Sequence, residues 1–181
     1  MVTDVGQNQL MACRYFKFTK HRSVVTSGGL GTMGYGLPAA IGATFGAPDR
    51  TVCLFVGDGG LQMTIQELGT IMQEGTGVKI VLLNNNWLGN VRQWQELFFK
   101  ERYSATRMIN PDFEKIAQAY GIERVLVEKR EDLRPAVERM FADDKPFILD
   151  VHITEENRVF PMVPPGKAVS EIMLNAKEWY K

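Results

Sequence analysis

The chain has no excess of either charge and no long apolar run. Lysine plus arginine and aspartate plus glutamate number 21 each, which argues against non-specific binding to nucleic acid or to an anionic membrane surface. No stretch reaches the ~20 apolar residues that a membrane span needs. A site for a small molecule suits this balanced composition better than a nucleic-acid or membrane surface.

Cysteine is also scarce, because only Cys13 and Cys53 are present and their spacing is not that of a metal site. Cys53 lies within an apolar run, so buried, reduced thiols are expected. Met1 is followed by Val-Thr-Asp-Val-Gly rather than by a signal or transit pattern. These features favour a cytoplasmic protein, or an organellar one if the parent is eukaryotic.

Segments rich in Val, Ile and Leu alternate with helix-like segments, and neither a repeat nor a linker interrupts them. The length of 181 residues, 45% of them hydrophobic, suits one domain with one core. Runs this apolar, without a two-residue period, are typical of strands that are covered on both faces. The sequence therefore predicts an α/β fold with a doubly wound, mostly parallel sheet flanked by helices. The strands are predicted at residues 51–56, 78–83, 124–127 and 147–153.

Two helices have clear sequence signals. Asn110 followed by Pro111 is the pattern of an N-cap and a first helical turn, and Gly121 ends the helix that this pattern predicts over residues 112–120. A further helix is predicted over residues 131–142.

A glycine-rich segment, Gly29-Leu-Gly31-Thr-Met-Gly34, follows the short apolar run of residues 24–26. With Asp58 at the end of the next strand, it matches the dinucleotide-binding fingerprint. Glycine clusters before a helix are nevertheless common wherever backbone must approach a ligand or another strand. The fingerprint requires neither glycines on both sides of the acid nor later asparagines, and both are present here. A nucleotide-binding or structural α/β module is therefore kept as the alternative.

Polar side chains follow two consecutive predicted strands. Asp58 lies in Gly57-Asp-Gly-Gly60, and Asn84-Asn-Asn86 follows the next strand. Carboxyl ends of parallel strands meet at one edge of a sheet, where ligands bind. Carboxylate, amide and carbonyl oxygens suit an octahedral Mg²⁺ that also accepts diphosphate oxygens. The glycines let backbone N–H groups point at phosphate, and a helix from about Thr64 is expected to add its positive end.

The spacing of these two motifs resembles that of the thiamin-diphosphate enzymes. In this family Gly-Asp-Gly is followed, after about twenty-five residues of helix and strand, by Asn-Asn. The resemblance implies that Asp58 and Asn85 give side-chain oxygens to Mg²⁺ and that Trp87 gives its backbone carbonyl. A turn residue at Asp58 and a polar turn at the asparagines form the alternative interpretation.

The resemblance also implies which residues hold the cofactor. The segment Val5-Gly-Gln-Asn8 is similar to the loop that surrounds the diphosphate, although a histidine is usual at the position of Asn8. Met33 matches the apolar residue that supports the bent cofactor, and Met63 matches a second apolar contact; either could instead fill the core. The complete set of expected cofactor-binding residues is Val5, Gly6, Gln7, Asn8, Gly31, Met33, Gly57, Gly59, Gly60 and Met63.

Other segments resemble the acetohydroxyacid synthase (acetolactate synthase) catalytic subunits within that family. They are Val91-Arg-Gln-Trp-Gln-Glu-Leu-Phe98, Tyr103-Ser104, Asn110-Pro-Asp-Phe113, Pro161-Met-Val163 and Gly166-Lys167. The resemblance implies that Trp94 lines the substrate channel, a core tryptophan being the alternative. Asn90 stands where methionine is usual. The shared cofactor element also occurs in related decarboxylases, oxidases and carboligases, which stay open as alternatives.

The activity implied by this resemblance is a thiamin-diphosphate- and Mg²⁺-dependent transferase reaction of branched-chain amino acid biosynthesis. Pyruvate condenses with a second 2-oxo acid, pyruvate or 2-oxobutyrate, and CO₂ is lost. The activating glutamate is expected in a pyrimidine-binding domain of a neighbouring subunit, so no catalytic residue is assigned here. FAD is expected in the full enzyme but not in this chain, together with a homodimer or tetramer and a regulatory small subunit. The isolated chain is expected to be inactive.

The resemblance also gives a division of the chain. Residues 1–153 are predicted to form the domain that binds thiamin diphosphate and Mg²⁺. Residues 154–181 contain three prolines and Gly166 within their first half. They are predicted to leave the sheet as a C-terminal tail that packs over the active-site side.

Overall fold

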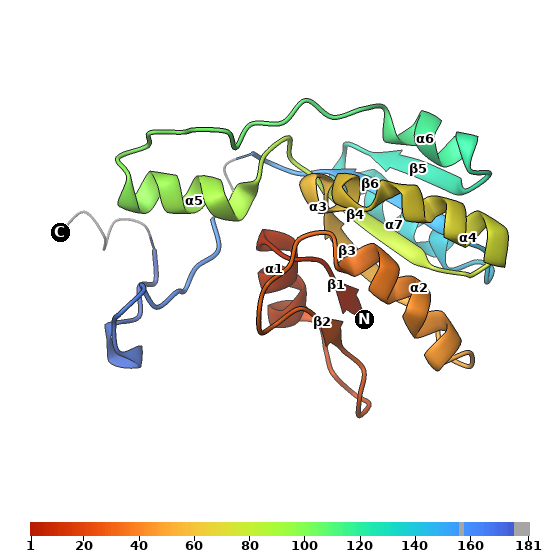
Figure 1. Ribbon diagram of the computed structural model, residues 1–181, viewed down its shortest axis with the longest axis horizontal. Coiled ribbons are helices and arrows are strands. Elements are labelled where there is room, and N and C mark those ends of the chain that lie inside the picture. Colours follow the sequence, from red (N-terminus) through yellow and green to blue (C-terminus); the bar gives the residue numbers. More distant parts are fainter. Residues whose placement is uncertain (156–157, 176–181) are drawn as a thin grey trace.

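The computed structural model describes residues 1–155 and 158–175 of the chain. Six strands form one sheet in the order β2-β1-β3-β4-β6-β5, and every pairing is parallel. The predicted parallel, doubly wound α/β sheet is therefore confirmed (Figure 1). The strands are β1 (Val2–Thr3), β2 (Val25–Thr26), β3 (Cys53–Gly57), β4 (Lys79–Asn84), β5 (Glu123–Val127) and β6 (Phe147–His152).

Helices cover both faces of the sheet. Strand side chains such as Leu54 and Ile80 pack on one face against α2, α4 and α6, and Leu149 packs on the other face against α7. Strand side chains on both faces are thus packed against helices, which explains the continuous apolar runs in the sequence. The helical elements are α1 (Gln7–Tyr15), α2 (Gly36–Gly46), α3 (Asp58–Met63), η1 (Ile65–Glu67), α4 (Leu68–Glu74), α5 (Gly89–Phe98), α6 (Phe113–Ala119), α7 (Arg130–Met140) and η2 (Val169–Glu171).

The predicted strands agree with β3, β4, β5 and β6 to within two residues at each end. The sequence did not predict β1, because two residues are too short for a recognisable pattern. The helix that was expected from about Thr64 begins earlier, at Asp58, so Gly59 and Gly60 lie inside its first turn. The predicted N-cap at Asn110 is wrong. Asp112 caps α6 instead, since its carboxylate accepts a hydrogen bond from the amide of Lys115 at 2.9 Å.

Helix α5 projects beyond the sheet, on the side where the C-terminal segment also runs (Figure 1). Gln93 of α5 is buried and holds this segment by its backbone. Its side-chain oxygen accepts from the amide of Val159 at 2.8 Å, and its side-chain nitrogen donates to the Val159 carbonyl at 3.2 Å. The division of the chain at residue 153 stays a prediction.

Two other expectations concern burial and membranes. Both cysteines are free, but they are half-buried rather than fully buried; burial raises the pKa of the Cys53 thiol to about 11. Among residues 1–155 and 158–175, no helix is long and apolar enough to cross a membrane.

The buried carboxylate of Asp4 joins three parts of the chain at the end of β1. One oxygen accepts from the amides of Val5 and Gly34, at 2.8 and 3.1 Å. The other accepts from the amide of Gly36 at 2.7 Å. A Cβ on Gly36 would lie 2.8 Å from the backbone nitrogen of Asp4, and a Cβ on Gly60 would overlap its carboxylate. The first turns of α2 and α3 therefore approach β1 through glycine.

We predict that Gly36→Ala lowers the free energy of unfolding by about 1–3 kcal/mol, because the new methyl group meets backbone that cannot move without loss of the Asp4 hydrogen bonds. Gly42→Ala in the same helix is the matched control, since a Cβ there meets nothing within 4 Å. The control is expected to be up to about 1 kcal/mol more stable than the parent. Urea unfolding measures both variants, and equal stabilities would contradict the prediction.

Candidate functional site

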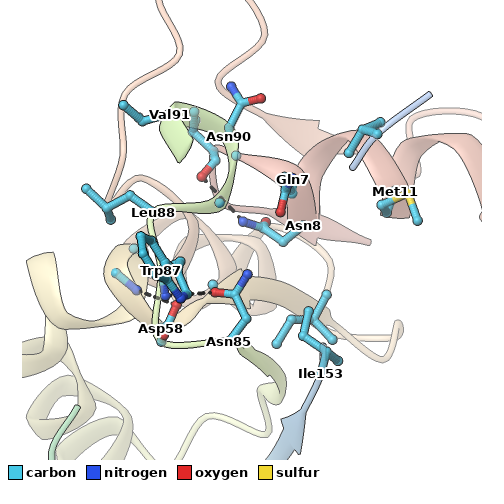
Figure 2. Close-up of a pocket in the computed structure, with 18 of the residues that line it drawn as sticks. Gln7, Asn8, Met11, Asp58, Asn85, Trp87, Leu88, Asn90, Val91 and Ile153 are labelled. Carbon is cyan, nitrogen blue, oxygen red and sulfur yellow. Dashed lines mark hydrogen bonds between the residues drawn. The ribbon is translucent and has the colours of Figure 1, made fainter. Parts of the chain in front are cut away.

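A cavity of about 220 Å³ opens at the carboxyl ends of β1, β3 and β4. Its wall begins with the segment after β1, continues through the Gly57–Gly60 turn and the Asn85–Val91 segment, and is completed by Ile153, Arg158 and Val159 from the C-terminal part of the chain. Figure 2 shows side chains from these separate segments around the cavity. This is the edge at which ligands bind in open parallel sheets.

Asp58 lies on the floor of the cavity and is only 1% exposed. One carboxylate oxygen accepts from the amide of Gly59 at 3.1 Å. The other accepts from the amide of Asn86 at 2.8 Å and from the side chain of Asn110 at 2.6 Å. Burial raises the pKa of Asp58, although these hydrogen bonds oppose the shift. The carboxylate is thus fixed in orientation by neutral donors.

The three consecutive asparagines point in different directions. Asn84 donates to the buried carboxylate of Asp150 at 3.3 Å. Asn86 has a left-handed backbone, with φ of 59°, and its backbone amide donates to the carboxylate of Asp58. Only Asn85 of the three lines the cavity, and its side-chain oxygen accepts from the amide of Trp87 at 3.1 Å. Asn85 and Asp58 thus face the same space from adjacent strand ends (Figure 2).

Trp87 lines the cavity and forms an isolated bridge with Arg107. The two hydrogen bonds of this bridge use the amide of Leu88 and the carbonyl of Asn86. The backbone carbonyl of Trp87 is therefore not used by this bridge.

The segment Val5-Gly-Gln-Asn8 also lines the cavity. Gly6 has φ of 131°, a conformation that glycine adopts at little cost. Asn8 is 8% exposed; its side-chain nitrogen donates to the Val5 carbonyl at 3.3 Å. Within the part of the chain that the structure describes, the side-chain oxygen of Asn8 has no hydrogen-bond partner. A buried acceptor of this kind calls for a donor from a bound molecule or water.

Gly59 and Gly89 leave room for neighbouring side chains at the cavity. A Cβ on Gly59 would lie 2.5 Å from the Leu88 side chain and 3.1 Å from the Met108 sulfur. A Cβ on Gly89 would overlap the side-chain oxygen of Gln7. Larger residues at either position would close the cavity or displace its walls.

Most of the sequence-predicted residues meet at this cavity, but three do not line it. Met33 lies on its wall with Val5, Gly6, Gln7, Asn8 and the Gly57–Gly60 turn. Gly31, Met63 and Trp94 lie outside its lining. Met63 is 53% exposed and Trp94 is 45% exposed, with its ring edge-to-face against Phe98 at 6.1 Å. These exposures argue against the core alternatives for Met63 and Trp94.

The last glycine of the dinucleotide fingerprint has a protein partner in this structure. In that fold the glycine-rich turn offers its backbone N–H groups to a pyrophosphate. In this chain the amides of Gly34 and Gly36 already donate to the carboxylate of Asp4. Gly34 and Gly36 thus join the start of α2 to the residue after β1.

A charged network borders the cavity at α5. Glu96 is buried and accepts from Arg158 at 2.7 Å, from Tyr103 at 2.8 Å and from Arg92 at 3.2 Å. The Arg92 guanidinium lies 4.1 Å from the Trp87 ring centroid. Burial alone would raise the pKa of Glu96, but the hydrogen bonds from Tyr103 and Arg158 and the charges of the two arginines lower it. Glu96 therefore fixes Arg158, which lines the cavity, through a charged contact.

Sequence reasoning missed several residues that build the site. Asp4, Gln93, Glu96 and Asn110 are buried or hydrogen-bonded at its edges, yet none was singled out for this role. Asp4 had a usable signal, because it is an acid directly after a short β-branched pair and directly before the predicted cofactor loop.

The sequence matches the profile of a known family over residues 4–151: "Thiamine pyrophosphate enzyme, C-terminal TPP binding domain". The match begins directly after β1 and ends within β6, and it includes Asp58 and the three asparagines after β4. The chain belongs to this family. As a thiamine pyrophosphate (thiamin diphosphate) binding domain, it has the fold that its motifs predict, and the predicted family is confirmed.

The domain is similar to acetolactate synthases from several organisms. It is 46% identical to the acetolactate synthase isozyme 2 large subunit of Escherichia coli (strain K12) over 174 residues, 96% of this chain and 32% of that protein. It is 46% identical to acetolactate synthase of Arthrospira platensis over 173 residues, 94% and 30% of the two chains. For the large subunit of Lactococcus lactis subsp. lactis (strain IL1403) the identity is 43% over 174 residues, 96% and 30% of the chains. The domain thus spans about a third of the length of these relatives.

We predict that Glu96→Gln lowers the free energy of unfolding by about 1–3 kcal/mol at pH 7, because hydrogen bonds between charged groups are lost. The folded-state pKa of Glu96 is below its usual value of 4.5. Its contribution is therefore complete above pH 4.5 and is lost as the pH falls through the lowered pKa. The fall in the free energy of unfolding on acidification should therefore be smaller for Glu96→Gln than for the parent. Urea unfolding over acid to neutral pH tests it, with Glu138→Gln on the exposed face of α7 as control; parallel pH profiles would refute the assignment.

Proposed function

We propose that the domain binds thiamin diphosphate and Mg²⁺ in this cavity and is the cofactor-binding part of an acetolactate synthase. The observation that carries the proposal is the meeting of Asp58 and Asn85 at adjacent strand ends, in one cavity, within a chain of the thiamine pyrophosphate family. The similarity to acetolactate synthases over 94% to 96% of the chain supports the choice of enzyme within that family.

In this proposal Mg²⁺ is held by side-chain oxygens of Asp58 and Asn85 and by the backbone carbonyl of Trp87. Hard oxygen donors of this kind suit an octahedral Mg²⁺, which retains positions for diphosphate oxygens and water. In the described ranges, no group of three or more His, Cys, Asp or Glu side chains could hold a metal ion by itself. The metal and the diphosphate therefore depend on each other, and we expect metal binding to be weak without the cofactor.

The diphosphate end of the cofactor is assigned to Val5, Gly6, Gln7, Asn8 and the Gly57–Gly60 turn. The space kept by Gly59 fits a group bound at this wall, and Asn8 can donate a hydrogen bond to a diphosphate oxygen through its side-chain nitrogen. Met33, whose side chain faces Gly59, is assigned to the support of the bent cofactor. Gly31 and Met63 do not line the cavity, and their contacts with the cofactor stay a proposal.

The proposed reaction is the condensation of pyruvate with pyruvate or 2-oxobutyrate, with loss of CO₂. Bound thiamin diphosphate supplies the electron sink that this chemistry needs. The residues of this chain bind, bend and orient it, and the apolar wall of Leu88, Val91 and Ile153 excludes water. Trp94, half-exposed on α5, is proposed to line the substrate channel in the full enzyme.

The proposal requires parts that this domain does not supply. The activating glutamate is assigned to a pyrimidine-binding domain of a neighbouring subunit, in a homodimer or tetramer with FAD in another domain. A regulatory small subunit is a further proposed partner, and nucleic acids and membranes are not. We propose a cytoplasmic location, or an organellar one for a eukaryotic parent; a relative from Schizosaccharomyces pombe is named mitochondrial.

The decisive experiment is a calorimetric titration of the chain with thiamin diphosphate, with and without Mg²⁺. We expect binding that requires Mg²⁺, and we expect Asp58→Ala and Asn85→Ala to abolish it while circular dichroism stays unchanged. Asp132→Ala removes an exposed carboxylate of α7 and should bind like the parent. Binding of NAD without metal would favour the nucleotide module instead, and undiminished binding by Asp58→Ala would refute the ligand assignment.

We further predict that the chain, although it binds the cofactor, makes no acetolactate from pyruvate when thiamin diphosphate, Mg²⁺ and FAD are supplied. The reason is the missing carboxyl group that relays a proton to the cofactor. Acetolactate and CO₂ are measured under conditions in which the titration gives full occupancy. Sustained turnover would show that this chain contains the proton relay.

A further inference from the structure

We propose that Asn110 is a positioning residue for the metal site: it fixes the carboxylate of Asp58 relative to the asparagine turn after β4. The inference rests on the proposed function, because it assigns a task to Asn110 only if Asp58 binds Mg²⁺. Asn110 lies between α5 and α6 and does not line the cavity. Its role would therefore be indirect.

The side-chain nitrogen of Asn110 contacts the two motifs at once. It lies 2.6 Å from a carboxylate oxygen of Asp58, 2.8 Å from the side-chain oxygen of Asn84 and 3.1 Å from that of Asn86. An amide nitrogen carries two hydrogens, so the three acceptors share them. One side chain thereby connects the end of β3 with the end of β4.

A further contact fixes which end of the amide faces the site. Gln62 of α3 donates to the side-chain oxygen of Asn110 at 2.8 Å. The opposite orientation of the amide would direct an oxygen at the carboxylate of Asp58 and would leave Gln62 only the longer bond, at 3.4 Å, to the Asp58 carbonyl. The network therefore has one orientation, in which Asn110 acts as a donor toward Asp58.

The chemistry of the donor matters as much as its position. Between residues 1 and 155 and between 158 and 175, no ion pair involves Asp58. A lysine or arginine at this position would orient the carboxylate but would also neutralise it. A neutral amide orients the carboxylate and leaves its negative charge for a divalent cation. Groups that orient metal ligands in this way typically contribute 10- to 100-fold to metal affinity.

The test is the apparent affinity for Mg²⁺, measured by calorimetry as the Mg²⁺ dependence of thiamin diphosphate binding. We expect Asn110→Ala to weaken it about tenfold or more. Asn110→Asp should weaken it further, because a second carboxylate replaces the donor. Asn110→Ser retains one donor of shorter reach, so its apparent Mg²⁺ affinity should be intermediate. It replaces the alanine variant in the test if the alanine variant does not fold.

Asp112→Ala is the matched control. It removes the N-cap of α6 in the same segment and should lower the melting temperature, but it removes no contact to Asp58. If Asn110 has only a structural role, Asn110→Ala and Asp112→Ala should both lose stability and retain the parent's Mg²⁺ dependence. That result would overturn the inference. Failure of the parent chain to show Mg²⁺-dependent binding would instead overturn the proposed function, and this inference with it.

Discussion

The architecture of the site depends on one buried carboxylate. Asp4 satisfies backbone amides of the segment after β1 and of the first turn of α2, and it lies against Gly60 of α3. A buried carboxylate is costly unless several donors satisfy it, and here the segment after β1 and the start of α2 must meet for that to happen, while Gly60 lets α3 approach closely. The cofactor loop candidate and the Gly57–Gly60 turn are adjacent because both are packed against Asp4.

The sheet supplies the second constraint. Because β1, β3 and β4 are parallel neighbours, their carboxyl ends open on one edge. The connections that leave this edge carry the polar groups, and the helices behind it carry the core. Catalytic families with this fold can therefore change side chains at the edge with little effect on the packing below.

Features of the site that follow from local sequence could be predicted. The apolar runs of β3 and β4 fixed where Asp58 and the asparagines would lie, because strand ends of a parallel sheet share an edge. The choice of Asn85 among the three asparagines came from a family pattern. The directions in which the three side chains point became clear only in the structure. The sequence could not give β1, whose two residues have no periodicity.

Long-range contacts explain the errors. Asn110 followed by Pro111 is a local signal for a helix start, but its hydrogen-bond partners at Asp58 and Asn84 are 52 and 26 residues away. The side-chain oxygen that an N-cap needs accepts from Gln62 instead, and Asp112 caps the helix. Residue type also could not tell that Met63 and Trp94 are not part of the lining of this cavity.

The hydrogen bonds between Gln93 and Val159 have a consequence for any effort to trim the protein to its smallest folded unit. A chain cut after the last strand would remove the Val159 acceptor of the Gln93 side-chain nitrogen and would leave the Gln93 oxygen with Gln7 as its donor. Glu96 would lose its contact with Arg158. Such a truncation would keep the sheet and yet remove one side of the cavity. The minimal unit for ligand studies is therefore longer than the minimal unit for folding, and the C-terminal boundary should be chosen beyond Val159.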